Sequence, residues 1–71
     1  MKINKAVKYY QELCGMTEYK LAMRSGVDRG ALNRALKNDD WNPELLTIIR
    51  LAKSLNNMKV SKIIQKAEKD I

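Results

Sequence analysis

The stretch from Thr17 to Lys37 reads TEYKLAMRSGVDRGALNRALK, and it decides the fold expected for this chain. Apolar residues recur at helical spacing on both sides of Gly26, and glycine readily adopts the left-handed conformation that ends many helices. Thr17 and Asp28 each stand where a helix would begin, and their side chains can accept hydrogen bonds from the amides of a first turn. The stretch therefore predicts two short helices joined by a tight turn at Gly26.

The second of these helices has two chemically different faces. Its apolar residues are spaced at i, i+3 and i+4 and are expected to face the core: Leu32, Ala35 and Leu36. The opposite face then carries a polar stripe of Arg29, Gly30, Asn33, Arg34 and Lys37. A charged stripe on an exposed helix is most often only a solvated surface, so its meaning depends on the sequence around it.

The rest of the chain is also helical in its periodicity, and no segment alternates apolar and polar residues like a half-buried strand. A first helix is expected to start with Asn4 as its N-cap and to face inward through Val7, Tyr10 and either Leu13 or Cys14. A last helix is expected to be capped by Ser61. The fold class predicted for the chain is all-α, with five helices.

The remaining helix is expected to start with Asn42 as its N-cap and Pro43 at its first position. It is the most apolar of the five, and most of its circumference is expected to be buried through Leu45, Leu46, Ile48, Ile49, Leu51, Ala52 and Leu55. Only a narrow face, with Thr47, Arg50 and Ser54, is expected to be exposed to solvent. Asn56 and Asn57 are expected to end it, because asparagine tolerates the left-handed conformation.

Composition limits the classes of function. The chain of 71 residues is expected to form one domain, 1–71, and it has one cysteine and no histidine, so the usual zinc sites cannot be assembled and no metal or cofactor is expected. No paired acids at catalytic spacing and no nucleophile beside a base suggest an enzyme. The sequence therefore favours a binding protein over a catalyst.

Charge and hydropathy suggest where such a protein would bind. Fourteen Lys and Arg against eight Asp and Glu leave a formal net charge of +6, which favours polyanionic partners without separating DNA from RNA or lipid. The chain shows no signal peptide, and its most apolar run is interrupted by Thr47 and Arg50. A cytoplasmic protein with no membrane partner is expected.

The order of residues resembles one known family. The pattern MT-x-x-x-LA-x-x-SGV-x-R-x-x-x-N-R from Met16 to Arg34, followed by NPELLTIIRLAKSL from Asn42 to Leu55, resembles the lambda-repressor and Cro family of helix-turn-helix DNA-binding domains. The resemblance implies a five-helix domain with the helix-turn-helix at 17–37 and a role as a sequence-specific regulator, of the small phage or prophage repressor type. Such domains usually bind double-stranded operator DNA as homodimers, with half-sites about one helical turn apart.

The resemblance also assigns roles to residues of the second motif helix. The family's base-contacting positions fall on Asp28, Arg29, Gly30, Asn33 and Arg34. Arginine can offer a planar fork to guanine, and asparagine can pair with adenine, each discriminating by roughly 1–3 kcal/mol. Arg34 and Arg29 are therefore the leading candidates, followed by Asn33, whereas Asp28 has a local use as a helix cap.

The resemblance implies phosphate contacts at Thr17, Glu18, Lys37 and Asn38, and Lys20 is a further candidate because it lies near them in the sequence. Glu18 departs from the family pattern, which commonly has Gln at this position, and a carboxylate beside a phosphate would repel it. Asp39 and Asp40 add further negative charge after the second motif helix. These acids predict weaker phosphate anchoring there.

Several apolar residues outside the motif are candidates for a dimer interface, namely Trp41, Met58, Val60, Ile64 and Ile71. All of them can equally be core residues, and for Trp41 packing over the core is the default interpretation. Two other functions stay open: the self-repressing antitoxin subunit of a toxin pair, and a module that binds a protein through the helix-turn-helix surface. No small-molecule ligand is expected.

Overall fold

The computed structural model describes residues 1–69, and within this range the chain forms helices and no strand. The five helices are α1 (Ile3–Leu13), α2 (Glu18–Ser25), α3 (Arg29–Leu36), α4 (Leu45–Ser54) and α5 (Val60–Lys69). The predicted all-α class is therefore confirmed. In residues 1–69 no helix has the length and apolar character needed to cross a membrane.

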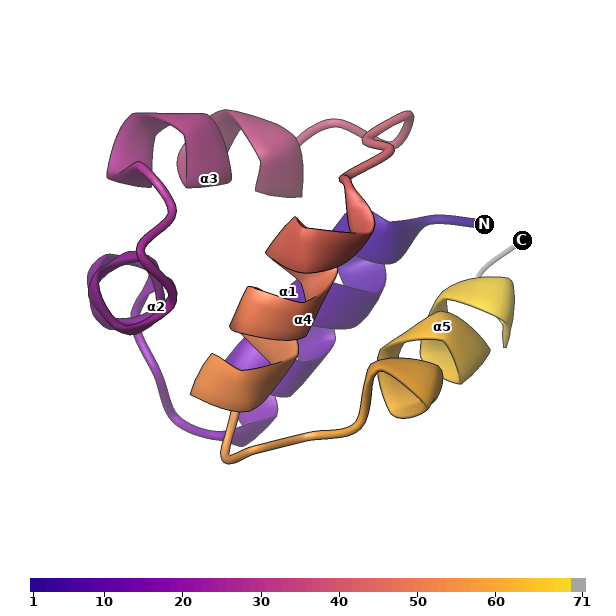
Figure 1. Cartoon of the computed structure of the whole chain (residues 1–71). Helices are drawn as coiled ribbons and strands as arrows, with labels where there is room; N and C mark the ends of the chain where they lie inside the picture. The colour runs from indigo at the N-terminus through magenta and orange to yellow at the C-terminus, as the bar shows by residue number, and fades with distance from the viewer. Residues whose placement is uncertain (70–71) are drawn as a thin grey trace.

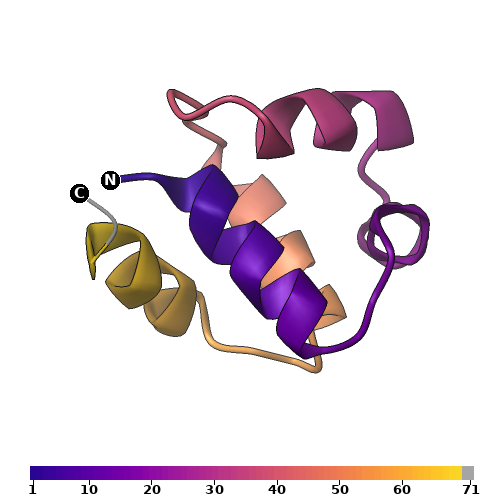
Figure 2. The same cartoon turned by 180° about the vertical axis from the view of Figure 1, so that it is seen from behind.

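The helices pack around one central region (Figure 1). α1 and α4 lie on opposite sides of that region, and α5 packs against α1 (Figures 1 and 2). α2 is seen along its axis in both views while α3 runs across them, so the two helices cross steeply. α3 occupies one end of the molecule, and the connection from α4 to α5 passes the opposite end.

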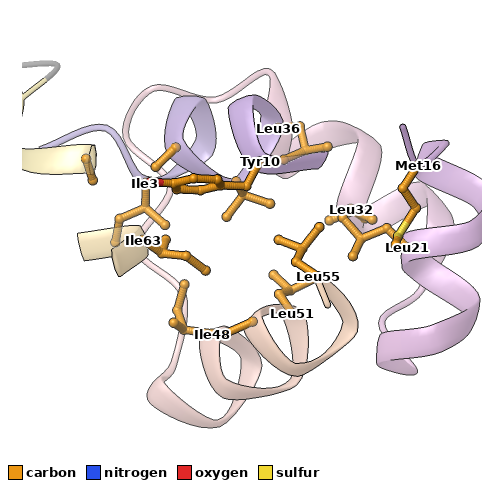
Figure 3. Packing of buried hydrophobic residues seen from close by; sticks show 14 of the residues in the cluster. Ile3, Tyr10, Met16, Leu21, Leu32, Leu36, Ile48, Leu51, Leu55 and Ile63 are labelled. Carbon is orange, nitrogen blue, oxygen red and sulfur yellow. The ribbon is translucent and has the colours of Figure 1, made fainter. Parts of the chain in front are cut away.

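The core is made by apolar side chains from all five helices and from the connection before α2. Figure 3 shows Ile48 and Leu51 of α4 facing Ile3 and Tyr10 of α1 across its centre. On the side toward α3, Leu32 is fully buried and Leu36 almost so, whereas Ala35 is half-buried. The predicted inner face of α3 is thus confirmed for its two leucines.

The predicted ends of α2 and α3 are also confirmed. Thr17 Oγ1 accepts a hydrogen bond from the Lys20 amide at 3.1 Å, and Asp28 Oδ2 accepts one from the Ala31 amide at 2.9 Å. Asn56 and Asn57 both adopt positive φ after α4, as expected for its end. At these three places, local capping chemistry sets the helix boundary where the sequence indicates it.

Three other predicted caps are wrong. α1 begins at Ile3, so Asn4 lies inside the helix, where its side chain is buried and bonded to distant residues. α4 begins at Leu45 behind Glu44, two residues later than Asn42 and Pro43 predict. α5 begins at Val60, so Ser61 is an exposed residue of its first turn.

The buried face of α4 also differs from the prediction, whereas at the end of α1 one of the two residues left open is selected. Leu45 and Leu46 are 70% and 54% exposed, because the side of α4 that meets the core is filled by Ile48, Leu51, Ala52 and Leu55. Ser54 is buried, since its hydroxyl donates to the Arg50 carbonyl at 2.8 Å and needs no water. At the end of α1, Leu13 is 68% exposed and Cys14 packs on the core instead.

Candidate nucleic-acid interface

The turn between α2 and α3 has a defined geometry. Gly26 has φ of +74°, and its amide donates to the Ala22 carbonyl at 3.0 Å, which closes the last turn of α2. Ser25 Oγ donates to the same carbonyl and accepts from the Val27 amide, both at 3.3 Å. Val27 packs against the core. Because each of these contacts is local or buried, the start of α3 is held firmly against the end of α2.

The outer face of α3 carries the predicted polar stripe. Arg29, Gly30, Arg34 and Lys37 are exposed, and Asn33 is half-buried. The Arg29 guanidinium lies over the ring of Tyr19 on α2, with its central carbon 5.2 Å from the ring centroid. This cation–π contact orients a flexible side chain and joins the two helices at the surface.

Arg34 lies over Gly30, one helical turn earlier. A Cβ atom at Gly30 would stand 3.4 Å from the Arg34 Nη1 atom and 3.3 Å from the Asp28 Oδ2 atom. The missing side chain at Gly30 therefore leaves room for the guanidinium to lie along the helix. The side chain of Asp28 serves as the cap of α3, as predicted.

A contact between α2 and α3 that sequence reasoning missed involves Glu18 and Asn33. Asn33 Nδ2 donates to Glu18 Oε2 at 2.8 Å, although fifteen residues separate them in the sequence. The carboxylate that was expected to oppose a phosphate is thus engaged with the middle of α3. An amide nitrogen carries two hydrogens, so Asn33 retains one donor and its Oδ1 acceptor for another partner.

The end of α3 is tied to α1 by a second unexpected contact. The buried Asn4 side chain donates through Nδ2 to the Leu36 carbonyl at 3.2 Å and to Asp39 Oδ1 at 3.0 Å. Lys2 Nζ lies 3.6 Å from the other Asp39 oxygen. The hydrogen bond from Asn4 first, and then the positive charges of Lys2 and Lys5, outweigh desolvation and lower the pKa of the Asp39 carboxyl. The charge of Asp39 is therefore balanced by α1.

The residues predicted to contact phosphate lie at two places. Thr17, Glu18 and Lys20 lie at the start of α2, where Thr17 and Lys20 are exposed and Glu18 is half-buried. Lys37 and Asn38 follow α3, and both are exposed. Asn38 Oδ1 accepts a hydrogen bond from the Asp40 amide at 2.9 Å, which shapes the loop after α3. The two places lie at the beginning and the end of the α2–α3 unit.

The apolar residues offered as a dimer interface belong largely to the core. Trp41, Met58, Val60 and Ile64 are all half-buried and packed against the core cluster. Packing over the core, the default interpretation of Trp41, is therefore confirmed. Ile71, the fifth candidate, lies outside the described residues. The large apolar side chains exposed on α4 are instead Leu45 and Leu46.

Comparisons of this chain with protein-family models, with curated proteins and with solved structures found no match.

Proposed function

We propose that this protein is a sequence-specific regulator that binds double-stranded DNA by placing α3 in the major groove, in the manner of a helix-turn-helix domain. The observation that carries the proposal is the outer face of α3. There Arg29, Asn33 and Arg34 project from a helix whose beginning is joined to α2 and whose end is bonded to α1. A rigidly held helix with groups able to read bases is what major-groove recognition requires.

The contacts of Asn33 support a specific role in this reading. With one amide hydrogen held by Glu18, the second hydrogen and the Oδ1 atom form an adjacent donor and acceptor. Adenine presents the complementary pair in the major groove, with N7 as acceptor and the N6 amino group as donor. Glu18 is therefore proposed to orient Asn33 toward adenine, rather than to contact a phosphate itself.

The two arginines are proposed to read guanine. Each guanidinium can donate two parallel hydrogen bonds to guanine O6 and N7. Arg29 is supported by the ring of Tyr19, and Arg34 has room over Gly30 to turn toward a base. Both side chains are thus already partly oriented at the surface, which lowers the entropy lost on binding.

The charge around α3 supports binding to a phosphate backbone. The chain carries a net charge of +6, and Thr17, Lys20, Lys37 and Asn38 offer donors on either side of the polar stripe. The carboxylate of Asp39, which would repel DNA, is paired with Asn4 and Lys2. Phosphate contacts of this kind give affinity and fix the register without selecting sequence.

Selection from a randomised pool of DNA duplexes, followed by sequencing of the bound fraction, tests the proposal. We expect an enriched motif containing guanine and adenine. Arg34→Ala is expected to relax base preference at one position of each half-site, by about 1–3 kcal/mol. Lys37→Ala, the matched control that removes a cation just after α3, is expected to weaken binding to all sequences alike. Recovery of no motif, with binding that disappears at moderate salt for every sequence, would contradict the proposal.

We further propose that the protein binds its site as a homodimer. Leu45 and Leu46 begin α4 with most of their apolar surface exposed, which supports contact with a second copy. Analytical ultracentrifugation with and without a palindromic form of the selected site tests this. A dimer on the DNA is expected, and a single monomer on that site would contradict it.

A further inference from the structure

Two adjoining grooves meet at Asn56, and the larger of them lies at the end of the molecule opposite α3. The larger, of about 540 Å³, has Cys14, Leu55, Met58, Lys59 and Lys62 in its lining. These residues come from the end of α1, the end of α4 and the start of α5, which Figure 1 shows together at that end. Asn56 belongs to both grooves and joins them.

The second groove, of about 340 Å³, is formed between α2 and α4 and is lined by Arg24, Arg50 and Lys53. The hydroxyls of Ser25 and Ser54 also line it, but both already donate to main-chain carbonyls. The chemistry that this groove offers to a ligand is therefore cationic.

The two grooves together gather five cations and no carboxylate from residues 1–69. Within these residues, none of the five cations is paired with a carboxylate in an ion pair. Like charges placed this close repel one another, and a negatively charged ligand would relieve that repulsion. The charge of the grooves is thus complementary to an acidic occupant.

The larger groove adds an apolar surface that a polyanion alone would not use. The half-buried side chains of Met58 and Cys14 provide this surface, and the fully buried Leu55 lies beneath them. A DNA duplex presents phosphates and sugars on a convex surface, and its apolar thymine methyl groups lie inside the major groove, where they cannot fill such a hollow. An acidic protein segment that also carries a large apolar side chain satisfies both features.

We propose that this pair of grooves, here named the Asn56 grooves, binds an acidic segment of a partner protein that anchors an apolar side chain against Met58 and Cys14. The cations along both grooves attract its carboxylates. Because the larger groove lies at the end of the molecule opposite α3, a segment anchored there leaves the outer face of α3 free. The proposal does not depend on DNA binding.

Two measurements on the full chain test the proposal. The first is fluorescence anisotropy with a labelled synthetic peptide in which leucine and phenylalanine alternate with aspartate and glutamate. The second is the rate at which a small reagent alkylates Cys14, the only cysteine of the chain, since a segment in the larger groove must shield that thiol. We expect the peptide to bind at low ionic strength and to slow alkylation in proportion to the fraction bound.

Charge reversal locates the binding. The double variant Lys59→Glu with Lys62→Glu is expected to weaken the affinity for the peptide by about tenfold, because two attractive contacts become repulsive. Lys8→Glu with Lys69→Glu changes net charge equally at exposed positions outside the grooves, and it is expected to weaken binding by less than about threefold. Circular dichroism establishes that both variants are folded.

Three results would overturn the proposal. The first is a peptide with the same acidic residues, but with serine in place of leucine and phenylalanine, that binds as tightly as the original peptide. Such a result would show that no apolar side chain is anchored in the groove. The second is equal weakening by the two double variants. The third is protection of Cys14 by DNA duplexes of any sequence and not by the peptide, which would make nucleic acid the occupant.

Discussion

Replacement of Asn4 tests how α3 is held in place. The side chain is 2% exposed, and its Nδ2 atom serves both the Leu36 carbonyl and Asp39. Asn4→Ala deprives the Leu36 carbonyl of this donor at a cost of about 1–3 kcal/mol. The change also removes the buried Asn4 Oδ1, which has no partner within residues 1–69. Removal of this unpaired oxygen stabilises the folded state by about 1 kcal/mol. The two effects leave a net loss of about 0–2 kcal/mol in the free energy of unfolding, and the loss of the hydrogen bond to Asp39 adds to it.

Urea unfolding followed by circular dichroism measures this loss. The slope with denaturant is expected to stay unchanged, and in thermal unfolding the Tm is expected to fall by up to about 16 °C. Asn42→Ala, at an exposed position, is the control and is expected to change stability by less than about 0.5 kcal/mol. A loss for Asn4→Ala no larger than that of the control would refute the importance of the two hydrogen bonds.

Asn4→Asp sharpens the same test because it conserves the shape of the side chain. The new carboxylate would lie beside Asp39 and face the Leu36 carbonyl, where Asn4 Nδ2 now donates. At neutral pH the variant is expected to lose about 3 kcal/mol or more, since a buried charge is left without a partner. The loss is expected to shrink as the pH falls and the new carboxyl is protonated. A loss independent of pH would contradict the electrostatic explanation.

Three further outcomes are expected. The pKa of Asp39 is lowered from 3.8, chiefly by the hydrogen bond from Asn4. The carboxylate therefore stabilises the fold fully above the unfolded pKa, and this contribution is lost as the pH falls through the lower folded pKa. Urea unfolding across pH 2 to 6, taken as about the titration range of carboxyls, should show a smaller loss of stability with falling pH in Asp39→Asn than in the natural chain. Leu51→Ala removes a fully buried side chain, and calorimetry is expected to show a loss of about 2–5 kcal/mol. Gly30→Ala is expected to raise helix stability by about 0.5–1 kcal/mol and to crowd the Arg34 guanidinium. Selection from a duplex pool should then show an altered preference at one base. An unchanged base preference would contradict the role given to Arg34.

The parts of the fold that the sequence predicts correctly are those that depend on neighbouring residues. Thr17, Gly26 and Asp28 act on amides and carbonyls within four positions along the chain. Leu32 and Leu36 are four residues apart and so share one side of α3. These short-range rules are sufficient to predict two helices, the turn between them and the outward direction of the polar stripe.

The errors occur where a residue's environment is made by distant parts of the chain. Asn4 has the chemistry of a helix cap, but its side chain is instead bonded to residues 32 and 35 positions away in the sequence. Leu45 and Leu46 are apolar enough for a core, yet the core of a chain this small accepts only one side of α4. Burial depends on which surfaces meet, and helical periodicity by itself does not specify that.

The candidate interface divides in the same way. The sequence by itself determined which residues of α3 face outward, because the spacing of its leucines leaves no other side for Arg29, Asn33 and Arg34. Only the tertiary structure decided how those side chains are held, since the bond from Asn33 to Glu18 and the stacking of Arg29 on Tyr19 both require α2 to cross α3. A pattern along one helix specifies a direction from that helix, whereas a contact between two helices depends on the packing that brings them together.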